Sequence, residues 1–219
     1  MFVIVRHGNT FEPGELPRRI GARTDLPLTQ GGVAQAEALG RHFADHGFHF
    51  ARILVSPLLR TRQTAGTIAA CLEASPAPES CDWLREIDHG PDEDMAESAV
   101  LARVGQAALD AWDSRAEPPP DWIVEAPMRL AAWRALFAEP RDGPTLIVTS
   151  NGAARFALLA RPELLARPEL LARPELLARP ELLAAISGTA SLKLPTGGYG
   201  TILRDANGGL SVPVWGRRP

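Results

Sequence analysis

Short apolar runs alternate along this chain with longer segments in which apolar residues recur at helical spacing. The runs at residues 2–5, 53–55 and 145–149 have the length and composition of buried strands. Helices are predicted over about 29–46, 57–72, 97–114 and 122–138, and further strands near 189–194, 199–204 and 210–214. Strands that alternate with helices predict an α/β fold, a three-layer α/β/α sandwich with a mostly parallel central sheet.

The helix boundaries are marked by residues with known end preferences. Thr29 stands where an N-cap is expected, and Gly47 ends the helix that Thr29 opens. Ser56-Pro57 closes the second strand and begins the next helix. Residues 11–29 form a loop rich in Pro, Gly and Arg, and residues 73–96 are irregular.

A hexapeptide array occupies residues 161–184, which are four perfect copies of Arg-Pro-Glu-Leu-Leu-Ala. Proline inside a helix costs about 3 kcal/mol, so we predict single helical turns that break at each Arg. Identical copies indicate a tandem duplication that lengthens a helix–loop junction within one domain, residues 1–219. The alternative is that the leucines form a surface for a homo-oligomer.

Composition and charge narrow the function classes. The 219 residues are 45% hydrophobic with a net charge of −3, which argues against nucleic acid and anionic membranes as partners. No apolar run is long enough to span a bilayer and no signal-like segment is present, so a cytoplasmic protein is expected. Cys71 and Cys81 lack metal-like spacing and indicate a reducing compartment.

The tripeptide Arg6-His7-Gly8 directly follows the first predicted strand. Ligands collect at the carboxyl ends of strands in open α/β sheets, and glycine lets the backbone approach a ligand closely. A neutral imidazole nitrogen is a nucleophile near pH 7, and a guanidinium forks onto phosphate oxygens. The strand end therefore predicts a site for phosphoryl chemistry.

Two later segments add polar groups of the same kind. Arg60 lies on the first turn of the helix that follows the second strand, where helix N-termini bind anions, and it is expected to reach the same phosphate as Arg6. Glu86 lies in the irregular segment, where a general acid could sit. His89 stands among several acidic residues and is interpreted as a structural pair.

Four motifs in this order carry a family resemblance. They are Arg6-His7-Gly8-Asn9-Thr10, Asp25-Leu26-Pro27-Leu28-Thr29, the stretch from Ser56-Pro57 through Arg60 to Gln63-Thr64-Ala65, and Leu84-Arg85-Glu86. Together they resemble the histidine phosphatase superfamily in its phosphoglycerate-mutase-like branch, from residue 2 to about 90 and again over 145–158.

This resemblance implies a mechanism without metal or cofactor. His7 would attack phosphorus and become a phosphohistidine, and Arg6 and Arg60 would balance charge on the phosphoryl oxygens. Glu86 would protonate the leaving oxygen and then activate water. As further phosphate or substrate contacts the resemblance implies Asn9, Thr10 and, at the entrance of the site, Arg23.

One position departs from the family. A second histidine is expected in a Ser-His-Gly setting, and this chain has Ser150-Asn151-Gly152 there. The Asn151 amide donates a hydrogen bond but carries no charge, so a reduced rate is expected. The leading hypothesis is a metal-independent phosphatase acting on a small phosphorylated substrate. The alternative is a non-catalytic phosphate-binding or assembly protein, and a mutase-type phosphotransferase is less favoured.

Overall fold

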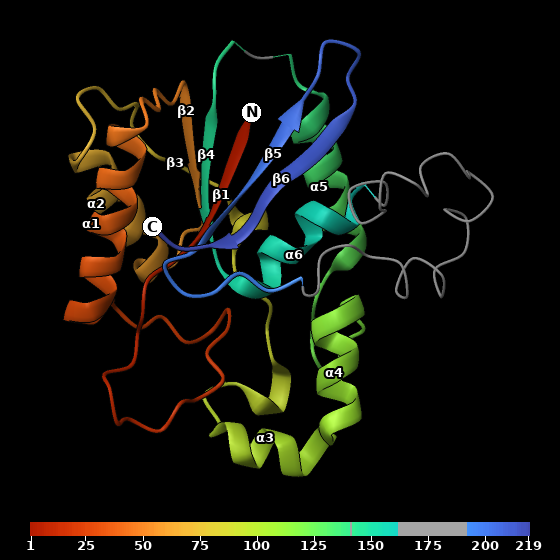
Figure 1. Ribbon diagram of the computed structural model, residues 1–219. Helices are drawn as coiled ribbons and strands as arrows, with labels where there is room; N and C mark the ends of the chain where they lie inside the picture. The colour runs from red at the N-terminus through yellow and green to blue at the C-terminus, as the bar shows by residue number, and fades with distance from the viewer. Residues whose placement is uncertain (141, 162–191) are drawn as a thin grey trace.

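The computed structural model describes residues 1–140, 142–161 and 192–219, which form a six-stranded sheet with helices on both faces (Figure 1). The strand order is β3-β2-β4-β1-β5-β6. The strands are β1 Phe2–Arg6, β2 Arg52–Val55, β3 Glu79–Ser80, β4 Thr145–Thr149, β5 Tyr199–Arg204 and β6 Leu210–Arg217. The helices are α1 Gln30–Asp45, α2 Leu59–Ala70, α3 Glu97–Val104, α4 Gln106–Arg115, α5 Ala126–Ala138 and α6 Asn151–Leu159.

The pairing of the strands brings three strand ends to one edge. The strands β3, β2, β4 and β1 run parallel, whereas β5 and β6 are antiparallel to their neighbours. In register, Arg6 at the end of β1 stands opposite Thr149 at the end of β4. The segments that leave β1, β2 and β4 therefore begin side by side, which is where ligands bind in such sheets.

Helices cover the sheet as the sequence predicts. In Figure 1, α1 and α2 lie on one side of the strands, and α5 and α6 lie on the other. Along β1, Val3 and Val5 belong to the apolar cluster with α1 and α2, and Phe2 and Ile4 belong to the cluster with α5 and α6. Both faces of β1 are buried, which explains its unbroken apolar run and confirms the three-layer α/β/α sandwich.

Several element boundaries differ from the sequence-based expectation. The helix predicted over 97–114 is two helices, because Gly105 has φ +78° between α3 and α4. The helix predicted from 122 begins only at Ala126, after Glu125 in the left-handed region. The two-residue strand β3 was not predicted, and α2 begins two residues later than expected. By contrast, Thr29 caps α1 as predicted, accepting a hydrogen bond from Gly32 N at 3.0 Å.

The predicted strand near 189–194 is wrong at residues 192–194, which are not in a strand. The backbone N–H and C=O of Leu194 bond to side chains instead. Leu194 N donates to Asn151 Oδ1 at 2.9 Å, and Leu194 O accepts from Arg6 Nη1 at 2.9 Å. Residues 189–191, and all but the first residue of the array at 161–184, lie outside the described residues. No helix in the described ranges combines the length and apolar character needed to cross a bilayer.

Candidate functional site

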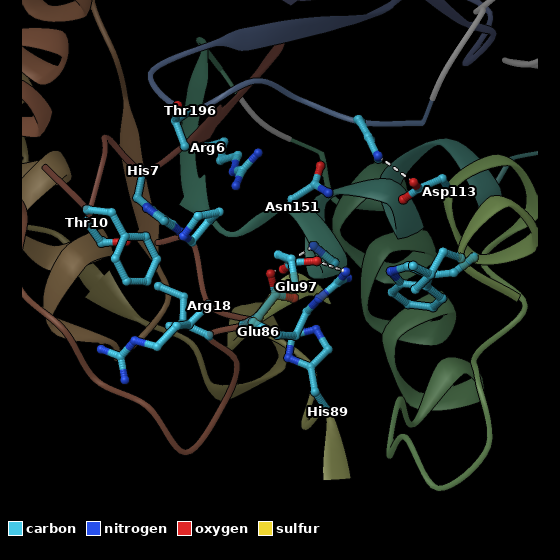
Figure 2. Close-up of a pocket in the computed structure, with 18 of the residues that line it drawn as sticks. Arg6, His7, Thr10, Arg18, Glu86, His89, Glu97, Asp113, Asn151 and Thr196 are labelled. Carbon is cyan, nitrogen blue, oxygen red and sulfur yellow. Dashed lines mark hydrogen bonds and ion pairs between the residues drawn. The ribbon is translucent and has the colours of Figure 1, made fainter. Parts of the chain in front are cut away.

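A cavity of about 560 Å³ opens at the carboxyl ends of β1 and β4 (Figure 2). Arg6 and His7 reach it from β1, Glu86 from the irregular segment, and Asn151 and Gly152 from the start of α6. Asn9 and Thr10 also line it, as the sequence predicts. Three motifs far apart in the sequence thus meet at a single cavity.

The imidazole of His7 is held in the form that a nucleophile requires. The side chain is 4% exposed, and its Nδ1 lies 2.8 Å from Gly8 O. Because a carbonyl oxygen only accepts, Nδ1 carries the ring hydrogen, and Nε2 keeps a lone pair that accepts from Arg60 Nε at 3.2 Å. Burial, with the charges of Arg60 and Arg6, lowers the pKa of His7 well below its usual value. The ring is therefore neutral at pH 7.

The guanidinium of Arg6 supplies the positive charge inside the cavity. Its Nη1 donates to Leu194 O at 2.9 Å, and its buried Nε–H has no partner among the described residues. A buried unpaired donor is rare and is typical of a binding group. Burial lowers the pKa of Arg6 to about 10, so the group remains charged at neutral pH.

Arg60 occupies a different place from the one expected. Its side chain is fully buried and is not part of the cavity lining. The guanidinium donates to Thr24 O at 2.7 Å, to Gly21 O at 3.0 Å and to the His7 ring. The prediction that Arg60 faces the phosphate is thus not met in this structure, because segment 21–24 folds over the start of α2 and takes its donors. Arg60 instead orients His7.

Glu86 is anchored by backbone donors from two sides. Oε1 accepts from Ile87 N at 2.9 Å, and Oε2 accepts from Gly152 N at 3.0 Å, at the positive end of α6. Burial by itself would raise the pKa of Glu86, but the charge of His89, these two hydrogen bonds and Arg60 outweigh it and lower the pKa. Glu86 is therefore a carboxylate at neutral pH, and its role as acid and then base stays a prediction.

Asn151 serves two purposes at the first position of α6. Its Oδ1 accepts from Leu194 N, which ties segment 192–196 to the cavity. The amide NH2 remains as the donor that Asn151 can offer a ligand. The prediction that Asn151 can still donate at this site is compatible with this geometry, although the side chain carries no charge.

Arg23 does not line the cavity. Its side chain is 57% exposed, its Nε pairs with Asp88 Oδ1 at 3.0 Å, and its Nη2 donates to Gly90 O. The expected role at the entrance is wrong for this structure, since the side chain turns outward and holds the neighbouring loop.

The opposite end of the cavity was missed from the sequence. We call it the α4 end; it is formed by Trp112, Asp113, Arg155 and Lys193. The Arg155 guanidinium lies 4.0 Å from the centre of the Trp112 ring and 3.9 Å from Asp113, which also pairs with Lys193. Burial lowers the pKa of Arg155 to about 10. Arg155 is four residues after Asn151 on one helix, and this spacing could have placed both on one face.

His89 also lines the cavity, beside Glu86 (Figure 2). Its side chain is almost fully buried, and its Nδ1 lies 3.5 Å from Glu93 Oε2. The ring packs edge-on against Trp122, with centres 4.6 Å apart. Nδ1 lies near Glu93 without a hydrogen bond to any described residue, so the pairing of His89 stays a prediction, and the ring also lines the cavity. Across the described ranges, no group of three His, Cys, Asp or Glu side chains is arranged to hold a metal ion.

Comparisons of the sequence point to a single family. A model described as histidine phosphatase superfamily (branch 1) matches residues 2–166. A 2,3-bisphosphoglycerate-dependent phosphoglycerate mutase of Methylobacterium sp. is 29% identical over 165 residues, covering 73% of this chain and 78% of the relative. A phosphoglycerate mutase of the same description from Bacteroides thetaiotaomicron is 26% identical, covering 64% and 56%. The chain spans only about half the length of several such relatives.

Solved structures share the fold. A mycobacterial glucosyl-3-phosphoglycerate phosphatase aligns with a TM-score of 0.71 at 16% identity, covering 100% of this chain and 99% of the other. A phosphoserine phosphatase of Entamoeba histolytica, solved with 3-phosphoglyceric acid, aligns with a TM-score of 0.67 at 19% identity, covering 98% and 95%. Both similarities support the α/β architecture described above.

Proposed function

Since the chain belongs to branch 1 of the histidine phosphatase superfamily, we propose that it hydrolyses a phosphomonoester through a phosphohistidine on His7. The observation that carries this proposal is the state of His7, a neutral ring whose Nε2 holds a lone pair at a cavity that also contains Arg6. A neutral imidazole beside a buried cation is suited to attack a phosphoryl group and to balance its charge.

Other residues of the site bind the phosphoryl oxygens and orient His7. The Arg6 guanidinium and the Asn151 amide donate to the phosphoryl oxygens, and Asn9 and Thr10 add neutral contacts. Gly8 O keeps the ring hydrogen on Nδ1, and Nε2 is the attacking atom once the phosphoryl group takes the place of the Arg60 Nε–H that the lone pair now accepts from. The Glu86 carboxylate lines the same cavity.

Hydrolysis is favoured over phosphoryl transfer between two substrate positions. A mutase must hold a second acidic group of its substrate. The described cations farther from His7 already have carboxylate partners: Arg18 pairs with Asp94, Arg19 with Glu97, and Arg155 and Lys193 with Asp113. The volume of the cavity suits a small phosphorylated molecule with a polar leaving group.

The proposal is tested by trapping the intermediate. The protein is incubated with ³²P-labelled p-nitrophenyl phosphate without added metal, quenched rapidly in alkali and analysed for label. We expect an acid-labile phosphoenzyme on His7, no label in His7→Asn, and unchanged labelling in His49→Asn, a matched change at an exposed histidine outside the cavity.

The alternative is a phosphate-binding protein without turnover, which the uncharged Asn151 favours. Phosphate binding by calorimetry that needs Arg6, together with no label and no turnover over a panel of phosphoesters, would overturn the phosphatase proposal in favour of this alternative.

A further inference from the structure

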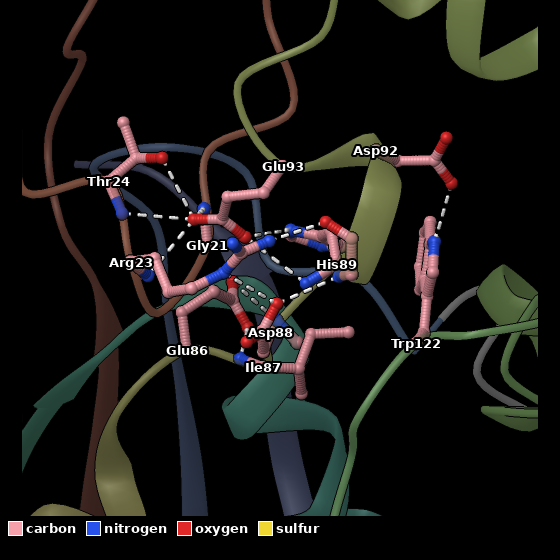
Figure 3. Close-up of polar contacts among 12 residues, drawn as sticks. Gly21, Arg23, Thr24, Glu86, Ile87, Asp88, His89, Asp92, Glu93 and Trp122 are labelled. Carbon is pink, nitrogen blue, oxygen red and sulfur yellow. Dashed lines mark hydrogen bonds and ion pairs between the residues drawn. The ribbon is translucent and has the colours of Figure 1, made fainter.

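Glu93 is a buried carboxylate that the proposed mechanism does not use (Figure 3). Its side chain is 5% exposed, and it does not line the cavity that holds His7 and Glu86. A carboxylate is rarely buried to this extent unless it is paired or functional. The donors around its two oxygens indicate which of these applies.

One oxygen of Glu93 gathers the donors of segment 21–24. Oε1 accepts from Gly21 N at 2.9 Å, from Arg23 N at 3.0 Å, and from the backbone N–H and hydroxyl of Thr24 at 2.9 and 2.8 Å (Figure 3). Hydrogen bonds to an ionised acceptor are stronger than those between neutral groups. Glu93 therefore fixes the backbone of this segment.

The segment approaches Glu93 so closely that position 21 requires glycine. A Cβ on Gly21 would stand 2.3 Å from Glu93 Oε2 and 2.5 Å from Ile87 O. The next residue of the segment continues the contact, since Ala22 N donates to Ile87 O at 2.9 Å. The segment thus lies directly against the 86–93 loop.

The same segment binds Arg60 through its carbonyl oxygens. Thr24 O accepts from Arg60 Nη1 at 2.7 Å, and Gly21 O accepts from Nη2 at 3.0 Å. With both Nη atoms bound in this way, the Nε–H points at the ring of His7 and donates to its Nε2 at 3.2 Å. The direction of the guanidinium therefore depends on where the segment lies.

Glu93 also acts on Arg60 through its charge. Burial would raise the pKa of Glu93, but the contacts with His89 and Thr24 outweigh burial and lower the pKa to about 2, so the side chain is a carboxylate at neutral pH. Burial lowers the pKa of Arg60, and the negative charge of Glu93 is among those that act in the opposite direction. Backbone hydrogen bonds and charge thus both link Glu93 to Arg60.

We propose that Glu93 positions the nucleophile His7 by holding Arg60 in place. Segment 21–24 carries the effect, because its N–H groups bind Glu93 and its C=O groups bind Arg60. The Nε–H of Arg60 then sets the direction of the Nε2 lone pair of His7. This inference rests on the proposed phosphohistidine mechanism, in which Nε2 attacks phosphorus. Glu93 is a positioning residue, and the guanidinium it holds is in place before the substrate binds.

The first test follows the ring of His7 by NMR and does not depend on turnover. The protein carries ¹⁵N-labelled histidine, the His7 resonances are assigned by their absence in His7→Asn, and the ring is titrated from pH 4 to pH 8. In Glu93→Ala we expect the Nε2 resonance to move toward that of a free lone pair, and the pKa of His7 to rise by about one unit, because Arg60 no longer donates to it. Loss of a negative charge would by itself lower this pKa.

A double-mutant cycle separates action through Arg60 from a general loosening of the site. Arg60→Met should change the ring in the same direction, and Glu93→Ala added to Arg60→Met should add less than about a third of its own effect. Glu37→Ala, in an exposed ion pair, leaves the ring unchanged. Additive shifts in the double mutant, or an unchanged ring in Glu93→Ala, overturn the proposal.

Two further variants guard against a folding defect in Glu93→Ala. Glu93→Gln keeps an acceptor for segment 21–24, and we expect less than about half of the change seen in Glu93→Ala. Gly21→Ala keeps the charge of Glu93 but displaces the segment, and should shift the ring in the same direction as Glu93→Ala. Its matched control Gly66→Ala, with no atom within 4 Å of the new Cβ, leaves the ring unchanged. A ring in Gly21→Ala that matches the wild type overturns the proposal.

Kinetics of the same variants test the proposed function separately. In single turnovers with p-nitrophenyl phosphate we expect phosphorylation of His7 to be about a hundredfold slower in Glu93→Ala, with a smaller loss in Glu93→Gln. A wild-type rate in Glu93→Ala overturns the positioning role. A wild-type protein that p-nitrophenyl phosphate does not label overturns the proposed function, and the ring resonances still decide whether Glu93 positions His7.

Discussion

The site is built from two regions that hold their side chains in different ways. In the first, which we call the strand-end cluster, Arg6, His7 and Asn151 leave the sheet at β1 and β4, and the ladder continues into the site through His7 N, which donates to Thr149 O at 3.0 Å. In the second, the 86–93 loop, there is no regular ladder, and the carboxylates of Glu86 and Glu93 bind backbone N–H groups of distant segments. Regular pairing fixes His7 in the first region, and buried carboxylates that accept from backbone N–H groups fix the second.

Within the strand-end cluster, the largest loss of activity is expected on substitution of His7. We expect His7→Asn to lower kcat/KM for p-nitrophenyl phosphate by at least about 10⁴-fold, because the change removes the proposed attacking nitrogen. The melting temperature should stay close to that of the wild type, since the Asn amide can replace part of the hydrogen bonding. Residual turnover above about one per cent would mean that His7 is not the nucleophile.

The two regions are in contact at Gly152, whose N–H donates to Glu86, and a substitution there should disrupt this contact. A Cβ at this position would lie 2.1 Å from Glu86 Oε1, so Gly152→Ala must push the carboxylate away from the start of α6. We expect about a hundredfold loss of kcat/KM. The matched control is Gly66→Ala, an exposed position in α2 with no atom within 4 Å of the new Cβ. It should stabilise the protein by about 0.5–1 kcal/mol and leave the rate unchanged. Equal activity in the two variants would contradict this placement of Glu86.

The 86–93 loop is expected to make the unfolding free energy of the protein fall at acidic pH. The pKa of Glu93 in the folded protein, about 2, lies below its ordinary value of 4.5. Its stabilising effect is therefore complete above about pH 4.5 and is lost as the pH falls toward 2. The full shift corresponds to about 3 kcal/mol of unfolding free energy, of which about 2 kcal/mol is lost between pH 5 and pH 3, the range in which urea denaturation measures it. Glu93→Gln should lack this part of the pH dependence, whereas Glu37→Gln, in an exposed ion pair, should keep it. Identical acid profiles for wild type and Glu93→Gln would refute the prediction.

The smallest effects are expected at Asn151, where a polar group links the cavity to segment 192–196. Asn151→Leu removes the acceptor of Leu194 N and the amide donor, and should lower kcat/KM by about tenfold. Asn151→His keeps a donor, and we expect a rate within about threefold of the wild type. A gain of a hundredfold or more in Asn151→His would show that the natural residue limits the site.

The layers of the fold could be predicted from local patterns in the sequence. The strands β1, β2 and β4 follow from short apolar runs, and the start of α1 follows from the preference of Thr29 for an N-cap, because both signals depend on neighbours close in the chain. The order of motifs also placed Arg6, His7 and Glu86 at one site. The sequence does not predict the break at Gly105, since a helical apolar pattern continues across it, whereas the backbone there has φ +78°.

The directions in which the polar side chains of the site face depend on contacts between distant segments. Arg60 turns behind His7 and Arg23 turns outward because segment 21–24 folds back against Glu93 and the start of α2, across some 70 and 35 residues of chain. The backbone of Leu194 bonds to the side chains of Arg6 and Asn151 instead of to a neighbouring strand. The His89 ring lines the cavity and lies close to Glu93. Such contacts join groups far apart in the sequence, and no local periodicity or end preference records them.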